Sequence, residues 1–499
     1  MNPKSRNILL ALVGVVLFAG VCTCAAATGI FAYSTFGDTV EQFIDDPSAL
    51  FEPTPPIVGA EPIEQEPETP MGADIDLAEL FAPFWEARQI IHDEFYEQPV
   101  DDDVLAQGAL DGLVTYLADF GVDLDDYTVP ETSPGPESLA TEAETPSEVA
   151  DSFLDFWAAW ERAEYADLQG QFAYEQLMRA SLGGMVESLG DQHTFYLNPD
   201  QLRQSDLSLQ GEYEGIGAWV DTTTEYLTII APMEGSPAEA AGLLPGDRVL
   251  AIDGEDMTGL SGDEVISHIL GPEGTEVTLT IGRDGEAEPF DVVITRARIF
   301  VASVESEILE DDIAYVQLFT FGASTNSELR IELEDVLAEN PRALIFDLRN
   351  NGGGYLDTAI QVASEFIADG VILNEEFGDG TQQTYRAQGD GLATDIELIV
   401  LVNAGSASAS EIVAGAIQDY GRGLLVGETT YGKGSVQVSP SLSNSQGALR
   451  ITVAHWLTPE GRQIHELGLE PDIAIPLTEE DSAAELDPQL DAALEYLTQ

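Results

Sequence analysis

The stretch VNAGSASASEI, residues 402–412, decides the fold because it joins a strand directly to a helix through small residues. The apolar run at its start is typical of a buried strand, and residues 408–420 predict a helix. A serine at this point lies at a helix N-terminus, where free N–H groups favour a developing negative charge. The competing interpretation is that Ser406, Ser408 and Ser410 are only helix caps.

The segments on either side of this stretch alternate between strand and helix. Strands are predicted at 314–319, 343–348, 396–403 and 424–427, and helices at 358–368 and 408–420. This βαβ order is typical of a mainly parallel sheet with helices on both faces, and we assign it to an α/β domain at 298–480. An acidic helix is expected at 481–499. Ligands bind beyond the carboxyl ends of strands in such sheets, so the loops there are candidates for the functional site.

Two of these loops carry unusual residues. DLRNNGGG at 347–354 has three glycines that can expose backbone N–H groups to an anion, although a flexible turn would look the same. GETTYGKGSVQ at 427–437 contains Lys433, and the only other lysine of the chain is Lys4. Burial can turn a lysine, unlike an arginine, into a neutral base. Lys433 is therefore a candidate catalytic residue, with chance survival of one lysine as the alternative.

Composition limits the classes of function. The 499 residues suggest two to four domains, and the hydrophobic fraction of 44% allows sizeable cores. The formal net charge of −73 makes nucleic acid a very poor partner and is typical of a strongly solvated surface, suited to salty surroundings. Both cysteines, Cys22 and Cys24, lie in the apolar N-terminal run, so the rest of the chain offers no disulfide framework, cysteine zinc site or thiol nucleophile.

The N-terminus has the features of a membrane anchor. Lys4 and Arg6 precede an uncharged stretch, 8–33, that is long enough to span a bilayer. Basic residues before it and acidic residues after it predict a cytoplasmic N-terminus and an extracytoplasmic body. We assign 1–34 to a cytoplasmic stub and transmembrane signal-anchor, and the acidic, Pro-rich segment 35–75 to a disordered tether. A cleaved signal peptide is the alternative.

Residues 76–200 are predicted to form a helical region with an internal duplication. An apolar pattern at 76–119 recurs at 148–191 with a fixed offset of 72 residues, and the identities include Phe-x-x-Phe-Trp in both copies. We interpret the two copies as a duplicated helical hairpin; coincidence between amphipathic helices is the alternative. Residues 124–147 between them predict a linker. The region would serve as a scaffold or as the interface of a homodimer.

A compact β-rich domain is predicted at 209–297. Apolar residues there fall in short alternating runs. The sequence GSPA at 235–238 predicts a short helix that begins with a serine cap and a proline. It is followed by GLLPGD at 242–247, which turns the chain into a strand.

The ordered set of these motifs resembles the carboxy-terminal processing (tail-specific) serine proteases, which contain a PDZ domain. The motifs are, in order, GDQHT at 190–194, GSPA and GLLPGD in the β-rich domain, DLRNNGGG, SASASEI and GETTYGKGSVQ. No single motif is decisive, but the ordered set is specific. The resemblance covers 76–119 and 172–477, about two-thirds of the chain. It implies a multidomain α/β protein whose protease core resembles the ClpP/crotonase-like fold.

The resemblance also implies roles for individual residues. Ser408 matches the nucleophile of the family, Lys433 matches its base 25 residues later, and Gln437 matches the residue that orients the lysine. The oxyanion hole would be formed by backbone N–H groups of Ala409 and of either Gly353 or Gly354. The choice between the two glycines stays open, because Gly352 stands where many relatives have proline. In the PDZ domain, residues Gly215, Ile216 and Gly217 would lie near the carboxylate of a bound peptide.

The expected function is that of an extracytoplasmic serine endopeptidase, which recognises C-terminal tails and cleaves through an acyl-enzyme. Its partners would be proteins with free C-termini, the membrane through the N-terminal anchor and a second copy of the chain; no metal or organic cofactor is needed. A catalytically inactive PDZ scaffold is the main alternative. A Ser-His-Asp hydrolase using His455 or His465 is a second one, although no Gly-x-Ser-x-Gly motif accompanies them. His193 is assigned a structural or gating role.

Overall fold

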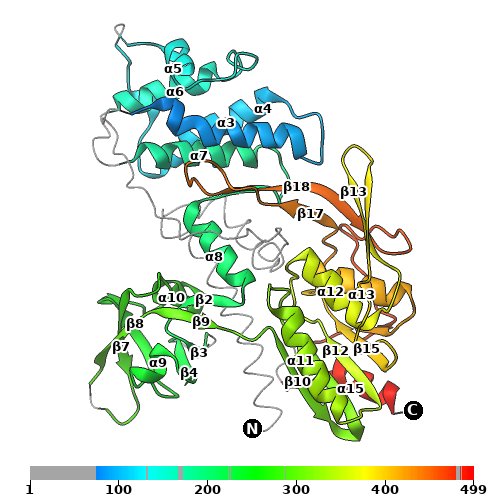
Figure 1. Cartoon of the computed structure of the whole chain (residues 1–499). Coiled ribbons are helices and arrows are strands. Elements are labelled where there is room, and N and C mark those ends of the chain that lie inside the picture. The colour runs from blue at the N-terminus through cyan, green and yellow to red at the C-terminus, as the bar shows by residue number, and fades with distance from the viewer. Residues whose placement is uncertain are drawn as a thin grey trace.

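The structure is a computed structural model that describes residues 75–498 except 131–132, 167–171, 223, 225, 287, 479–480, 482–483 and 485. Figure 1 shows a helical region at the top, a β-rich domain at the lower left and an α/β core at the lower right. The predicted anchor and nearly all of the predicted tether lie outside the described residues. Among the helices that are described, none has the length and apolar character needed to cross a membrane.

The α/β core is built on a six-stranded sheet with the order β10-β11-β12-β15-β16-β19. The strands are β10 (Val304–Leu309), β11 (Ile313–Leu318), β12 (Ala343–Asp347), β15 (Glu397–Val402), β16 (Leu424–Gly427) and β19 (Ile473–Ala474). Only β10 is antiparallel to its neighbour, so the predicted mainly parallel sheet is confirmed.

Helices cover both faces of this sheet, as predicted. The side chains of one face pack in a core with α11 (Thr325–Ala338), α12 (Leu356–Phe366) and α13 (Ala409–Asp419). Alternate side chains of β11, β12 and β15 point the other way and pack on α15 (Pro488–Leu497), which falls within the predicted C-terminal helix. Each strand therefore contributes side chains to the cores on both faces of the sheet, because successive side chains of a strand point to opposite sides.

A second, antiparallel sheet was not predicted. It has the order β1-β18-β13-β14, with β17 paired to β18. The strands are β1 (Phe195–Leu197), β13 (Val371–Phe377), β14 (Gln382–Arg386), β17 (Ser435–Val438) and β18 (Ala448–Leu457). The long strand β18 runs from the α/β core up to the helical region (Figure 1). Its Leu449 and Ile451 belong to the hydrophobic core of the helical region, whereas its Trp456 belongs to the core of the α/β domain.

The β-rich domain has a sheet with the order β3-β4-β5-β7-β8, in which β3 is an edge strand. Its elements are β3 (Ala218–Asp221), β4 (Thr228–Pro232), α9 (Pro237–Ala240), β5 (Arg248–Ile252), β6 (Glu255–Asp256), α10 (Gly262–Ile269), β7 (Glu276–Gly282) and β8 (Phe290–Thr295). The predicted start of α9 is confirmed, since Ser236 Oγ accepts the N–H of Glu239 at 3.2 Å. A separate two-stranded ribbon, β2 (Glu212–Gly215) with β9 (Ala297–Phe300), frames this domain.

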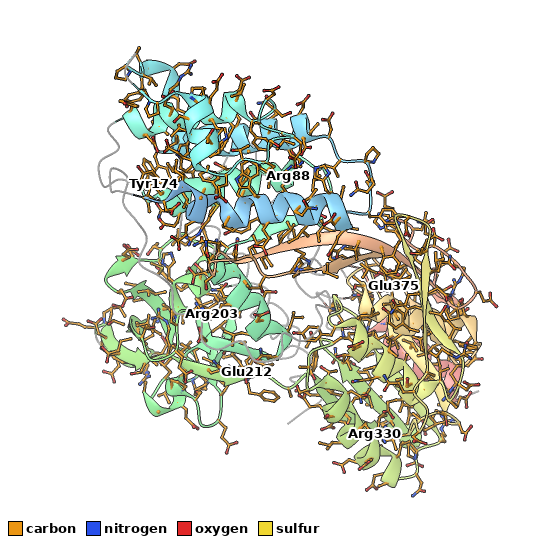
Figure 2. The ribbon with its side chains drawn as sticks, turned by 45° about the horizontal axis from the view of Figure 1, so that its top comes forward. Arg88, Tyr174, Arg203, Glu212, Arg330 and Glu375 are labelled. Atoms are coloured by element: carbon orange, nitrogen blue, oxygen red, sulfur yellow. The ribbon has the colours of Figure 1, made fainter. Side chains whose placement is uncertain are left out.

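The helical region contains α3 (Leu77–Glu94), α4 (Asp102–Asp119), α6 (Leu154–Tyr165) and α7 (Tyr174–Glu187). Arg88 of α3 is labelled in Figure 2. It donates to both carboxylate oxygens of Asp102 at 2.7 and 2.9 Å and so fixes the start of α4. The linker prediction for 124–147 was wrong. That segment holds a 3-10 turn, η2 (Leu124–Asp126), and a helix, α5 (Pro136–Glu142), whose Leu139 joins the aromatic core. The helix α8 (Pro199–Leu209) then leads toward β2.

The two sequence copies pack on one another around a two-fold relation within one chain. Phe84 and Phe156, which occupy equivalent positions, stack with ring centroids 5.8 Å apart. Phe81 contacts Trp157 at 4.8 Å, and the reciprocal pair, Phe153 with Trp85, contacts at 5.1 Å. Reciprocal contacts of this kind are the mark of an isologous interface. The duplication predicted from the sequence is therefore matched by the packing.

The equivalent helices α4 and α7 cross where both copies have glycine. A Cβ atom on Gly184 would lie 2.7 Å from the Cα of Gly112 and 2.3 Å from the carbonyl oxygen of Gly108. A Cβ atom on Gly112 would likewise lie 3.0 Å from the Cα of Gly184. Any side chain would separate the helices, so the glycines set their close approach.

Candidate active site

The candidate site lies where the parallel strands β12, β15 and β16 end at one edge of the sheet. The loops after these strands are joined by hydrogen bonds. Ser406 Oγ donates to the carbonyl of Leu348 at 2.8 Å, and Ser410 Oγ donates to the carbonyl of Asn351 at 2.7 Å. The N–H of Tyr431 donates to the carbonyl of Ser406 at 3.0 Å. Ser406 and Ser410 therefore connect the glycine loop to the helix start, and the helix-cap interpretation does not describe them.

Ser408 lies at the turn between β15 and α13 in an unusual backbone conformation. Its φ is 53° and its ψ is −114°, and its side chain is almost completely buried. A non-glycine residue with positive φ costs free energy, and such residues concentrate at functional sites. A strained serine on a strand-to-helix turn is also how α/β-hydrolases expose their nucleophile. The conformation agrees with the role predicted for Ser408.

A buried carboxylate, Glu411, holds this turn against the loop that carries Lys433. Its Oε2 accepts the backbone N–H groups of Ser408 at 2.8 Å and of Lys433 at 2.9 Å. Its Oε1 accepts the N–H of Gly432 at 2.8 Å and the hydroxyl of Thr430 at 2.5 Å. Burial raises the pKa of Glu411 to about 7, although the four donors act in the opposite direction.

The sequence interpretation missed Glu411, although one signal was present. A glutamate three residues after a helix-starting serine has the spacing of a capping box, in which the carboxylate accepts the serine N–H. That spacing accounts for one of its four donors. The other three donors belong to 430–433, so only the fold reveals that the same carboxylate serves both loops.

Lys433 is buried, with 1% of its surface exposed. Its carbonyl accepts the indole N–H of Trp456 at 3.0 Å, which fixes the loop on β18. Burial is the main cause of the low pKa of His193, and the positive charge of Lys433 lowers it further. The structure thus brings the backbones of Ser408 and Lys433 together and places the lysine where solvent is excluded. Their catalytic roles stay predictions.

Gln437, on β17, is also buried and lies next to a chain of hydrogen bonds. Its Nε2 donates to Thr452 Oγ1 at 3.0 Å. Thr452 in turn donates from Oγ1 to Asp191 Oδ2 at 2.6 Å. Neither Thr452 nor Asp191 was predicted as a site residue, although Asp191 is part of the GDQHT motif.

The glycine loop supplies the other side of the site. A Cβ atom on Gly353 would lie 2.9 Å from both Ser408 Cβ and Ala409 N, so Gly353 lies directly against the helix start. The N–H of Gly353, however, donates to Asn351 Oδ1 at 2.9 Å. Among the hydrogen bonds of the described residues, none occupies the N–H of Gly354 or of Ala409. Of the two glycines, only Gly354 therefore has an N–H that these hydrogen bonds leave for the predicted oxyanion hole with Ala409.

The histidines do not form a triad with the serine. His455 stacks on Tyr96 at 4.2 Å and lies 4.6 Å from the ring of His465. In the described part of the chain, neither histidine is hydrogen-bonded to Ser408. Burial lowers the pKa of His193 to about 2, so its ring is neutral near pH 7. Nor does any group of three or more His, Cys, Asp or Glu side chains in the residues described here have the arrangement of a metal site.

The predicted peptide-binding residues lie at the entry to the edge strand of the β-rich domain. Gly215 ends β2, and Gly217, with φ 74°, leads into β3. Ile216 is buried in the core of this domain, and its carbonyl accepts the N–H of Ala238 at 2.8 Å. An edge strand such as β3 can accept an extended peptide as an additional strand. The loop thus lies where a peptide terminus would be expected.

Two parts of the chain match known protein families. Residues 312–475 match peptidase family S41, and residues 228–283 match the PDZ domain. The chain is 37% identical over 315 residues to a carboxy-terminal-processing protease of Bartonella bacilliformis, covering 61% of this chain and 71% of that protein. It is 39% identical over 326 residues to a carboxyl-terminal-processing protease of Synechocystis, covering 63% and 75%. A solved photosystem II D1 C-terminal processing protease aligns at 23% identity over 76% of this chain and 94% of that one, with a TM-score of 0.41.

Proposed function

Because this chain belongs to the carboxy-terminal processing serine proteases of peptidase family S41 and contains a PDZ domain, we propose that it cleaves proteins with Ser408 and Lys433 after capturing their C-terminal tails. One observation supports this assignment above the others. The backbone N–H groups of the strained Ser408 and the buried Lys433 converge on the same oxygen of Glu411. Two residues that lie 25 positions apart in the sequence therefore share one rigid anchor.

The proposed reaction proceeds through an acyl-enzyme. Lys433, as the neutral amine, removes the proton from Ser408 Oγ, and the oxygen attacks the carbonyl carbon of the scissile peptide bond. The N–H groups of Ala409 and Gly354 stabilise the oxyanion. The lysine then gives its proton to the leaving amine, and a water molecule, activated in the same way, releases the new carboxylate and regenerates the serine.

Capture of the substrate is assigned to the PDZ domain. An extended tail would pair with the edge strand β3, and its carboxylate would lie at the loop Gly215, Ile216 and Gly217. The strongly negative chain repels acidic tails, so apolar tails are the preferred class.

A location outside the cytoplasm is part of the proposal and rests on the sequence alone. The uncharged stretch 8–33 follows Lys4 and Arg6, which supports a membrane anchor with a cytoplasmic N-terminus.

Pairing of two chains also stays a prediction. The aromatic faces of the duplicated hairpins are already packed on each other within one chain, so a dimer would need other surfaces. Sedimentation velocity over a range of concentrations would measure the oligomeric state.

The test is cleavage of an unstructured protein that ends in an apolar tail. We expect the parent chain to cleave it, whereas Ser408→Ala and Lys433→Ala should not. Ser327→Ala, on the exposed side of α11, and Lys4→Arg are the matched controls and should cleave like the parent. Cleavage that survives Lys433→Ala would reassign the base to a histidine. Absence of cleavage by the parent, together with tail binding, would favour the inactive PDZ scaffold.

A further inference from the structure

We propose that Asp191 is a positioning residue for the catalytic base. Through the hydroxyl of Thr452, it determines which end of the Gln437 side-chain amide is left to face the lysine. The inference rests on the proposed roles of Lys433 and Gln437. It adds a residue from the helical region to the machinery of the α/β core.

The connection is a continuous chain of short hydrogen bonds. Gln437 Nε2 donates to Thr452 Oγ1 at 3.0 Å, and Thr452 Oγ1 donates to Asp191 Oδ2 at 2.6 Å. The same carboxylate oxygen accepts the hydroxyl of Thr194 at 2.6 Å. Thr194 Oγ1 also accepts the N–H of Thr452 at 3.0 Å, so the two threonines lie side by side. All but Asp191 are less than 5% exposed, and hydrogen bonds are strengthened where water is excluded.

The direction of these bonds fixes the amide of Gln437. A hydroxyl has a single proton, and a carboxylate can only accept. Because Thr452 gives its proton to Asp191, it can only accept from Gln437, and the NH2 end of the amide must face it. The carbonyl end must then face the opposite way, where it can accept from an amine. Without the negative charge at Asp191, the hydroxyl could turn and the amide could flip.

Asp191 belongs to a different part of the fold from the residues that it would position. It lies in the turn between α7 and β1, whereas Gln437 and Thr452 lie on β17 and β18. Since β1 pairs with β18, any displacement of α7 relative to the α/β core would change the geometry of this chain. The base would therefore be poised only when the helical region is correctly docked.

A purely structural role for Asp191 is the alternative, because its Oδ1 also accepts the N–H of His193 at 3.1 Å and so caps the turn. The internal duplication indicates that folding of the hairpin does not by itself require an aspartate at this position. Asp119, the equivalent of Asp191 in the first copy, is exposed at the end of α4. The same aspartate at the same hairpin end thus lies on the surface in one copy and points into the site in the other.

Other charged groups surround the lysine and must stay constant in a test. Glu411 accepts its backbone N–H, and the charge of Lys433 lowers the pKa of His193 after the larger effect of burial. The charges of Arg450, His455 and His465 also lower the pKa of His193. The variants below change none of these five groups, so a change at the lysine can be assigned to the chain from Asp191.

The first experiment measures the ionisation of the lysine directly. In the full chain, Lys4→Arg leaves Lys433 as the only lysine, so isotope-labelled lysine gives a single side-chain signal whose pH titration can be followed by NMR. We expect the titration of Lys433 to move to lower pH in Asp191→Asn, by about one unit, because a negative charge and an oriented acceptor for the ammonium are both lost. Asp379→Asn is the matched control. Asp379 Oδ1 accepts the backbone N–H of Thr381 at 2.8 Å and its hydroxyl at 2.6 Å in the β13–β14 hairpin, without a link to the base.

The second experiment measures cleavage by variants of Thr452 and Asp191. Thr452→Val removes the hydroxyl, and kcat should fall at least about tenfold with little change in KM, as part of the 10²–10⁴-fold effect of a positioned base. Thr452→Ser keeps the hydroxyl and should restore the parent kcat. The acidic limb of the kcat profile should move to lower pH in Asp191→Asn, which mere loss of folded protein would not cause.

Two results would overturn the proposal. One is a Lys433 titration that is the same in the parent and in Asp191→Asn; the other is equal loss of activity in Thr452→Ser and Thr452→Val. If Asp191→Asn fails to fold, the two threonine variants decide the question. The NMR titration needs no cleavage, so an inactive parent would contradict the proposed function without affecting this measurement.

Discussion

Ser408 and Lys433 donate their backbone N–H groups to one atom, Oε2 of Glu411, at 2.8 and 2.9 Å. The helix start and the glycine-flanked loop therefore cannot shift independently, because displacement of either would remove at least one of the four donors of a buried carboxylate. Such a loss is costly, since a buried charge needs all its hydrogen bonds. Glu411 thus fixes the relative position of the proposed nucleophile and the proposed base without taking part in the reaction.

Glu411→Gln should reduce cleavage strongly and change how stability depends on pH. Glu411 has a folded-state pKa of about 7, above the usual value of 4.5, so it contributes stability that is full below about pH 4.5 and is lost as pH rises through about 7. Between about pH 5 and about pH 8, the parent should lose up to about 3 kcal/mol more free energy of unfolding than Glu411→Gln loses. Denaturant unfolding at the two pH values measures the difference. An identical pH response in both proteins would contradict the raised pKa.

Gly353→Ala should abolish cleavage. The new Cβ atom would lie 2.9 Å from Ser408 Cβ, and the φ of 107° is unfavourable for alanine. Gly380→Ala is the matched control, because Gly380 also has positive φ, 77°, but has open space around it. Both changes should cost about 1 kcal/mol of backbone strain, and only Gly353→Ala should lower kcat. Full activity of Gly353→Ala would mean that the glycine loop is not part of the site.

Gly184→Ala should destabilise the helical region, whereas Gly183→Ala should not. A Cβ atom on Gly184 would lie 2.3 Å from the carbonyl oxygen of Gly108, so α4 and α7 would have to separate. The adjacent Gly183 has no atom within 4 Å of its Cβ position, and alanine there should add up to about 1 kcal/mol through helix propensity. Thermal unfolding monitored by tryptophan fluorescence is suitable, because Trp85, Trp157 and Trp160 lie in this region. Equal effects of the two changes would contradict the close crossing.

Tail binding should strengthen as salt rises. The net charge of −73 repels the carboxylate of a tail, and that repulsion is screened as the Debye length falls from about 10 Å at 0.1 M to about 3 Å at 1 M. The dissociation constant of an apolar peptide with a free C-terminus should therefore decrease with salt in a titration. The same peptide with an amidated C-terminus is the control and should bind weakly throughout. Binding that weakens with salt would indicate a local positive site in the PDZ domain.

The long strand β18 illustrates what the sequence interpretation could not predict. Most of its residues are apolar, but its partners β1 and β13 lie far away in the sequence, and strand pairing over such distances has no local signal. The linker error at 124–147 has a related cause. Proline and threonine favour turns there, yet α5 forms because Leu139 and Ala140 are buried against the aromatic cluster. Tertiary burial outweighed local propensity.

The sequence by itself determined the alternation of strands and helices, the helix that begins directly after Ser408, the repeat at an offset of 72 residues and the rarity of lysine, which singles out Lys433. These features follow from local periodicity and spacing, which neighbouring residues fix. Only the tertiary structure decided that Glu411 joins two loops and that Asp191 contacts Thr452, 261 residues away. Contacts between such distant residues depend on how whole domains dock, because hydrogen bonds reach only about 3 Å and register with the partner is set by the packing of the cores.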